Sequence, residues 1–165
     1  MSRFRPEETV TLSVLDRLID AHPEEKVDPP ITRNESLRRM KSALKRDMEW
    51  LLNTRRCQVM EELDDPGELA KSVLNYGLPD ISSMSVQSGK DHNRILRQME
   101  EAVEYFEPRL KNVRVSLRPV EKTSRTLRFT IDALLMIDPA PEQIRFDTVL
   151  ELTSGDIAVQ GEGGA

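Results

Sequence analysis

Cysteine and long apolar runs are scarce in this sequence. Its one cysteine, Cys57, has no second thiol for an intramolecular disulfide, which favours a reducing compartment, so the expected localisation is cytoplasmic. No apolar run approaches the roughly 20 residues that a transmembrane helix needs. The basic residues near the N-terminus are not followed by the apolar core of a signal peptide. We therefore expect neither export through a signal peptide nor membrane insertion.

Aromatic residues are also few, at 4% of the chain, whereas charged residues make up 32% and give a net charge of −5. This balance gives no support for binding to nucleic acid or to an anionic membrane, and it favours a protein partner. A length of 165 residues predicts a single domain with its own core. Its expected parts are an N-terminal extension (1–11), a mainly helical part (12–111), a β-sheet part (112–160) and a flexible tail (161–165).

Residue patterns that mark catalytic or cofactor sites are missing. The two histidines, His22 and His92, and Cys57 do not have the spacing of a zinc site. The sequence has no Walker loop, dinucleotide-binding fingerprint or nucleophile elbow. Glycoside hydrolysis needs only two well-placed carboxylates, but with 29 acidic residues the choice of a pair would be arbitrary. We predict no catalytic residue, no cofactor and no metal.

Two helices are expected in the first third of the chain. Ser13 followed by Asp16 resembles a capping box at the start of a short amphipathic helix. A long helix is expected to begin at Asn34 as its N-cap. Apolar residues follow at spacings of three and four, namely Leu37, Met40, Leu44, Met48, Leu51 and Leu52. Trp50 lies beside the last two; it could anchor an interface, but this neighbourhood favours a place in the core.

Two further helices are expected before the strands. Asp65-Pro66 is typical of a helix start, with Leu69, Val73 and Leu74 on an apolar face and Gly77 as the C-terminal glycine. Asp91 opens the next helix, which reaches Phe106. The residues on its buried side are Ile95, Leu96, Met99, Val103 and Phe106.

From Val113 onward the apolar period changes from about 3.6 to two. Three alternating sets follow, separated by turns, and a short segment Ile157-Ala158-Val159 comes last. Short turns between alternating segments indicate an antiparallel meander. The predicted fold class is α+β, with N-terminal helices packed on one face of a small, mainly antiparallel C-terminal sheet.

The segment Glu107-Pro108-Arg109-Leu110 lies where the helical pattern ends and the strand pattern begins. Pro108 cannot continue the helix and disfavours the α conformation at Glu107, so the helix should stop at Phe106. Glu107 and Arg109 flank this rigid residue. The segment is either a simple helix stop with solvated charges or a shaped interface.

Four separated motifs, in order, resemble those of the TssE family, the type VI secretion baseplate subunits related to the lysozyme-like wedge protein of contractile phage tails. They are Ser13-Val14-Leu15-Asp16-Arg17-Leu18, Asp47-Met48-Glu49-Trp50-Leu51-Leu52-Asn53-Thr54-Arg55, Ser72-Val73-Leu74-Asn75-Tyr76-Gly77-Leu78-Pro79-Asp80 and Phe106-Glu107-Pro108-Arg109-Leu110. The pattern covers residues 12 to 160.

The resemblance implies a non-enzymatic, cytoplasmic structural subunit of the baseplate. It implies that Glu107, Pro108, Arg109 and Leu110 dock on the wedge subunits TssF and TssG, with TssK as a further candidate partner. It also implies that a sheet edge pairs with strands of the sheath subunits TssB and TssC. The sequence leaves open which strand is the free edge, and the segment Ile144 to Leu152 is the candidate chosen for testing. Arg109→Ala is expected to leave the fold intact while abolishing docking. The alternative is a peptidoglycan-cleaving, lysozyme-like glycosidase.

Overall fold

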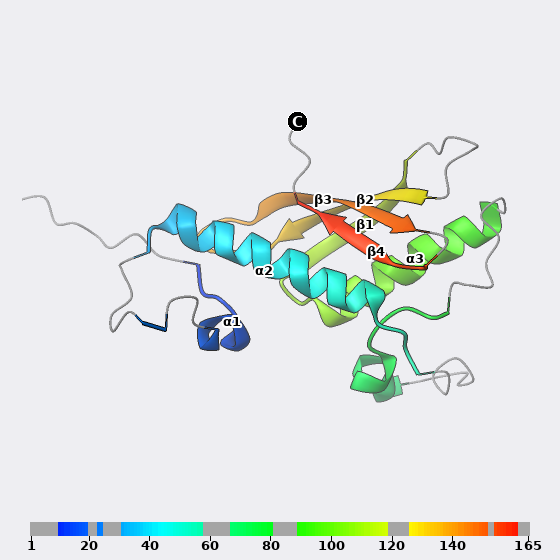
Figure 1. Ribbon diagram of the computed structural model, residues 1–165, viewed down its shortest axis with the longest axis horizontal. Helices are drawn as coiled ribbons and strands as arrows, with labels where there is room; N and C mark the ends of the chain where they lie inside the picture. Colours follow the sequence, from blue (N-terminus) through cyan, green and yellow to red (C-terminus); the bar gives the residue numbers. More distant parts are fainter. Residues whose placement is uncertain are drawn as a thin grey trace, which may run out of the picture. The chain divides into compact units, whose positions relative to one another are not determined.

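The computed structural model describes residues 10–19, 23–24, 31–57, 67–80, 89–118, 126–151 and 154–161 (Figure 1). The chain divides into two compact units, residues 1–44 and residues 45–165. The expectation of a single domain stays a prediction.

The first unit contains helix α1, Val14–Leu18, and the start of helix α2. Ser13 caps this helix as predicted, because the backbone N–H of Asp16 donates to the Ser13 hydroxyl at 3.1 Å. The apolar side chains of α1 are exposed rather than buried, with Val14 73% and Leu18 77% accessible. The helix ends at Leu18, and the backbone of the next residue, Ile19, is extended.

Helix α2, Arg33–Asn53, starts in the first unit and continues into the second. The prediction of Asn34 as its cap is wrong. Thr32 precedes the first helical residue, and its hydroxyl accepts from the backbone N–H of Glu35 at 3.3 Å. The predicted apolar positions are otherwise confirmed, since only Leu37 among them is partly accessible. The buried ones are Met40, Leu44, Met48, Leu51 and Leu52.

The helix expected after Asp65-Pro66 is replaced by two short 3₁₀ helices, η2 (Gly67–Lys71) and η3 (Val73–Asn75). The expected cap, Asp65-Pro66, lies outside the described residues. Ser72 separates the two pieces because its backbone is extended and its hydroxyl donates to the carbonyl of Leu69 at 2.7 Å. The predicted apolar face is therefore not buried: Leu69, Val73 and Leu74 are exposed.

The turn after η3 lies against the end of α2. Gly77 has φ +108°, as expected for a glycine-dependent turn. Leu78 forms a parallel bridge with Arg55, and its N–H donates to the carbonyl of Thr54 at 2.8 Å. This bridge fixes the exit of α2 beside the segment that leads to α3.

Helix α3, Gly89–Phe106, ends where Pro108 predicted. It buries Ile95, Met99, Ala102 and Val103 and packs on the first strand of the sheet (Figure 1). The sheet has four strands, β1 (Leu110–Leu117), β2 (Thr126–Leu135), β3 (Glu142–Glu151) and β4 (Ile157–Gln160). They run in the order β1-β2-β3-β4, and every neighbouring pair is antiparallel. The predicted α+β fold and meander are confirmed.

The outer strands of the sheet are β1 and β4. The choice of Ile144 to Leu152 as the free edge is therefore wrong, because β3 pairs with β2 on one side and with β4 on the other. The short β4 returns along β3 after a tight turn at Gly155, which has φ +78°. Leu152 lies outside the described residues.

A search of the described helices finds none with the length and apolar character needed to cross a membrane.

Candidate docking site

The segment Glu107 to Leu110 forms a tight turn between α3 and β1. The N–H of Glu107 still donates to the carbonyl of Val103 at 2.9 Å, and the N–H of Leu110 donates to the carbonyl of Glu107 at 3.0 Å. Pro108 occupies the second position of the turn, where its fixed φ is favourable, and it is exposed. One turn of chain therefore converts helix to strand and leaves the proline ring at the surface.

Glu107 and Arg109 engage each other across Pro108. The Glu107 carboxylate accepts from Arg109 Nε at 2.6 Å and from the Arg109 backbone N–H at 3.2 Å, and a third bond joins Oε2 to Nη2. Glu107 is only 5% accessible. Two charges that the sequence suggested as surface groups thus form a two-pronged, largely buried ion pair, which is the stronger type of charged hydrogen bond.

Asp47, from the second unit's part of α2, completes the pairing of Arg109. Its Oδ2 lies 2.7 Å from Arg109 Nη2. The hydrogen bond to Glu107 raises the pKa of Arg109 most, and the bond to Asp47 adds to this effect. Burial raises the pKa of the nearby Tyr76 hydroxyl, with further contributions from the charges of Asp47 and Glu107. Tyr76 packs edge-on against Phe106, with ring centroids 5.2 Å apart.

Arg46 extends the network to a tryptophan. Its Nη2 donates to the other oxygen of Asp47 at 2.7 Å, and its guanidinium carbon lies 5.0 Å from the centroid of the Trp50 ring. Trp50 is 53% accessible, so its expected place in the core is wrong. The helical period explains this: Met48, Leu51 and Leu52 occupy the buried arc, and a residue two positions after Met48 points to the opposite side.

These five residues are referred to below as the ion-pair cluster: Glu107, Arg109, Asp47, Arg46 and Trp50. It alternates negative and positive groups from the buried Glu107 carboxylate to the exposed Trp50 ring. Sequence reasoning missed Asp47 and Arg46 as members. The sequence offered one signal that Asp47 and Arg109 belong together: each lies in one of the four family motifs, Asp47 in the second and Arg109 in the fourth.

A comparison with family models matches residues 38–140 to the baseplate wedge protein gp25 family. The chain belongs to this family. The match spans more than half of the chain and includes all five residues of the ion-pair cluster. It confirms the family that the four motifs indicated, the TssE family of phage baseplate and type VI secretion proteins, and with it a structural role in a baseplate together with other baseplate components. A comparison with curated proteins gives no match.

Leu110 is the fourth predicted docking residue. It is fully buried and pairs with Leu135 in the sheet. It anchors the turn to the core. Any contribution of Leu110 to docking would therefore act through the position of Pro108 and Arg109.

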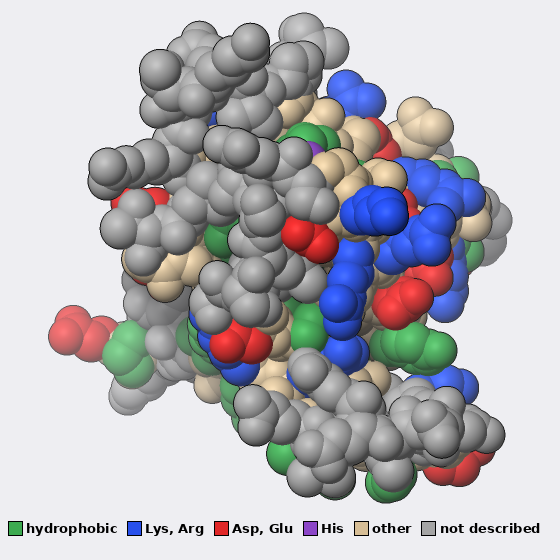
Figure 2. Space-filling view, turned by 90° about the vertical axis from the view of Figure 1, so that its right-hand side faces the viewer, with side chains coloured by type: hydrophobic (Ala, Val, Ile, Leu, Met, Phe, Trp, Pro, Cys, Tyr) green, Lys and Arg blue, Asp and Glu red, His purple; other side chains and the backbone are tan. Residues whose placement is uncertain are grey.

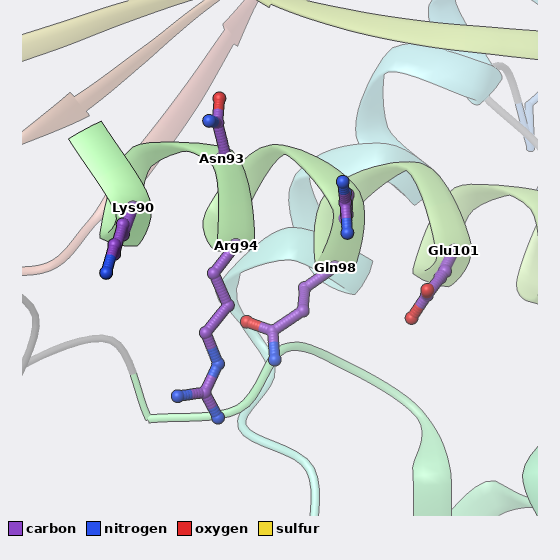
Figure 3. A pocket seen from close by; sticks show the side chains of 6 residues that line it. Lys90, Asn93, Arg94, Gln98 and Glu101 are labelled. Atoms are coloured by element: carbon purple, nitrogen blue, oxygen red, sulfur yellow. The ribbon is translucent and has the colours of Figure 1, made fainter.

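A second surface feature runs along α3. A shallow groove of about 400 Å³ is lined by side chains of this one helix (Figure 3): Lys90, Asn93, Arg94, Arg97, Gln98 and Glu101. Figure 2 shows lysine and arginine side chains gathered on the face it draws, with acidic side chains between them. The mixed charges of the groove lining do not single out one ligand class.

Within the described part of the chain, no group of three or more histidine, cysteine, aspartate or glutamate residues is placed to hold a metal ion.

Proposed function

We propose that this baseplate protein docks on the wedge of a type VI secretion system through Glu107, Pro108, Arg109 and Leu110 and that its sheet templates assembly of the contractile sheath. In this proposal the chain acts in the cytoplasm as a structural subunit, not as an enzyme. Its partners are TssF and TssG in the wedge, TssK as a further candidate, and TssB and TssC in the sheath.

The observation that carries the docking proposal is the double pairing of Arg109 with Glu107 and Asp47. A guanidinium held by two carboxylates from different elements cannot change rotamer freely, so the surface around Pro108 is ordered before a partner arrives. Preorganisation of this kind lowers the entropic cost of association. The arginine and the neighbouring exposed tryptophan are also the residue types most enriched among binding hot spots.

The residues of the docking site have different roles because they differ in burial. Glu107 is enclosed and serves Arg109, whereas Pro108 and Trp50 present apolar surface to a partner. The Arg109 side chain is 22% exposed, and its exposed part can add one charged contact at the centre of the docking surface. This arrangement suits a partner surface with an apolar patch and an acceptor for Arg109.

The proposal is tested by reconstitution from purified proteins. The chain is mixed with a TssF–TssG complex, and TssB and TssC are then added. We expect co-elution with the wedge complex and sheath polymers that form on this assembly but not on the wedge alone. Absence of co-elution would remove the docking proposal, and co-elution without sheath growth would remove the templating proposal.

The glycosidase alternative has its own test. Purified, folded protein is incubated with peptidoglycan, and released reducing sugar is measured beside an active lysozyme. The structural proposal predicts no release above the background without protein. Release at a rate that falls when a single carboxylate is replaced by its amide would establish the enzyme instead.

A further inference from the structure

Met136 lies beside the docking turn, just after the end of β2. Its backbone N–H donates to the carbonyl of Arg109 at 2.9 Å, so the ladder between β1 and β2 continues one residue past the pair of Leu110 and Leu135. Facing residues in such a ladder have Cα atoms about 5 Å apart. The Met136 side chain is 47% accessible, whereas Leu135 is fully buried. A large apolar side chain is therefore held at the surface next to Pro108 and Arg109.

Leu134 extends this apolar surface along β2. Side chains alternate across a strand, and the intervening residues Ala133 and Leu135 are buried. Leu134 and Met136 therefore lie on the opposite face of the sheet, called the open face below. Leu134 is part-exposed and faces Lys111 in register. These two side chains, Leu134 and Met136, form an apolar strip that begins at the docking turn and runs onto the open face.

Two cations flank the apolar strip. Lys111 and Arg114 are both exposed on β1. Arg114 faces Asp132 in register, but the Asp132 carboxylate accepts from Arg145 Nε at 2.6 Å. Within the described part of the chain, no carboxylate forms an ion pair with Lys111 or with Arg114. Because the chain as a whole has a net charge of −5, two unpaired cations at one place favour an acidic partner surface there.

We infer that the docking surface continues from Pro108 onto the open face of the sheet. There the apolar strip receives an apolar ridge of the wedge partner, and Lys111 and Arg114 meet carboxylates beside that ridge. The inference rests on the proposed docking function and names the chemistry of the partner surface. A strip of two side chains is too small to hold a second copy of the chain by itself, since stable interfaces bury roughly 1,200–2,000 Å². It fits instead as the extension of a larger contact centred on the docking turn.

The first test measures the affinity of full-chain variants for the purified TssF–TssG complex. Met136→Ser should raise the Kd about ten-fold, because it removes the more exposed half of the apolar strip. Leu74→Ser is the matched control, since Leu74 is 51% exposed on η3, and it should bind as wild type does. Thermal unfolding midpoints of both variants should stay at the wild-type value. Wild-type affinity of Met136→Ser, or an equal loss in both variants, would overturn the inference.

Charge reversal tests the two flanking cations. Arg114→Glu should slow association with the TssF–TssG complex about five-fold and weaken its dependence on salt, and adding Lys111→Glu should slow it further. Arg128→Glu makes the same change of charge on the open face of β2, about 20 Å along the strand from Leu134. This control should associate at the wild-type rate. Equal rates for Arg114→Glu and Arg128→Glu would contradict an acidic partner beside the strip.

Methionine oxidation adds a measurement on the unmodified sequence. Hydrogen peroxide converts an accessible methionine to its sulfoxide, and mass spectrometry follows the reaction at Met136. We expect several-fold slower oxidation of Met136 in the complex than in the free chain. An unchanged rate would contradict burial of Met136 by the partner. Slowing that depends on the concentration of the free chain, and not on the wedge proteins, would assign the strip to a second copy and overturn the inference.

Failure of the inference is separable from failure of the docking function. If the wild-type chain does not bind the TssF–TssG complex, both fail. If the wild-type chain binds and Trp50→Ala weakens binding while Met136→Ser does not, the docking function stands and only the inference about the open face fails.

Discussion

Arg109 Nη2 lies 2.7 Å from Asp47 Oδ2, although the two residues are 62 positions apart in the sequence. This contact ties the turn between α3 and β1 to α2. Glu107 holds the same guanidinium from the other side. Arg109 is therefore both a surface residue of the proposed docking site and a structural link between three elements of the second unit.

Arg109→Ala should lower the free energy of unfolding by about 3 kcal/mol, because it leaves the buried Glu107 carboxylate without its counter-charge. Urea denaturation measures the change. The matched control is Arg38→Ala, whose exposed side chain pairs with Glu35 and which should cost less than about 0.5 kcal/mol. Equal stability of Arg109→Ala and wild type would show that the buried pair contributes nothing. The expected loss also makes Arg109→Ala unsuitable as a pure docking variant.

Asn53→Ala should destabilise the β4 edge, because it removes both hydrogen bonds to Ile157. The expected loss is about 1–2 kcal/mol, with faster hydrogen exchange at the Ile157 amide. Asn93→Ala, at an exposed position on α3, is the control and should leave both quantities unchanged. If the Ile157 amide exchanges at the wild-type rate in Asn53→Ala, α2 does not close this edge.

Gly77→Ala should cost at least about 2 kcal/mol, since a left-handed backbone and a steric clash act together. A Cβ at residue 77, where φ is +108°, would lie 2.2 Å from the carbonyl oxygen of Thr54. Gly67→Ala separates the two effects, because Gly67 has φ +49° but open space around it. Its expected cost is about 1 kcal/mol. Equal losses in thermal or urea unfolding would mean that the contact with Thr54 is unimportant.

Stability should fall under alkaline conditions in a way that depends on Tyr76. The folded state raises the pKa of this hydroxyl above its ordinary value of 10.0, chiefly through burial. As the pH rises, the unfolded chain therefore loses the Tyr76 proton first. The neutral hydroxyl contributes its full share of folding stability below the ordinary pKa, and this share is lost as the pH rises through the pKa of the folded state. Urea midpoints measured from about pH 8 to about pH 11 should fall less steeply for Tyr76→Phe than for wild type. Parallel curves would contradict the raised pKa.

The sequence predicted what depends on local pattern. The alternation of apolar and polar residues predicted the strands of the sheet, including the short β4 that begins at Ile157. Pro108 predicted the end of α3. The prediction of Asn34 as the cap failed because threonine and asparagine are both good cap residues, and only the backbone path shows that Thr32 takes this position. Spacing also could not show that the apolar residues after Gly67 would remain exposed on broken 3₁₀ turns.

The ion-pair cluster could not be predicted from local sequence patterns. No periodicity links Asp47 to Arg109, because their contact depends on how α2 and the α3–β1 turn pack in three dimensions. The identity of the sheet edges was hidden for the same reason. Ile144 to Glu151 has the alternation of any half-buried strand, and only its pairing with β4 shows that it is central.

The most direct test of the docking account is the affinity of Trp50→Ala for the TssF–TssG complex. Trp50 is exposed, so its loss should change stability by less than about 0.5 kcal/mol. As a hot spot beside Arg46 it should cost at least about 2 kcal/mol of binding, or roughly a 30-fold higher Kd. Leu18→Ala, at an exposed apolar residue of the first unit, is the control and should bind as wild type does. A folded Trp50→Ala protein with wild-type affinity would contradict docking through the ion-pair cluster.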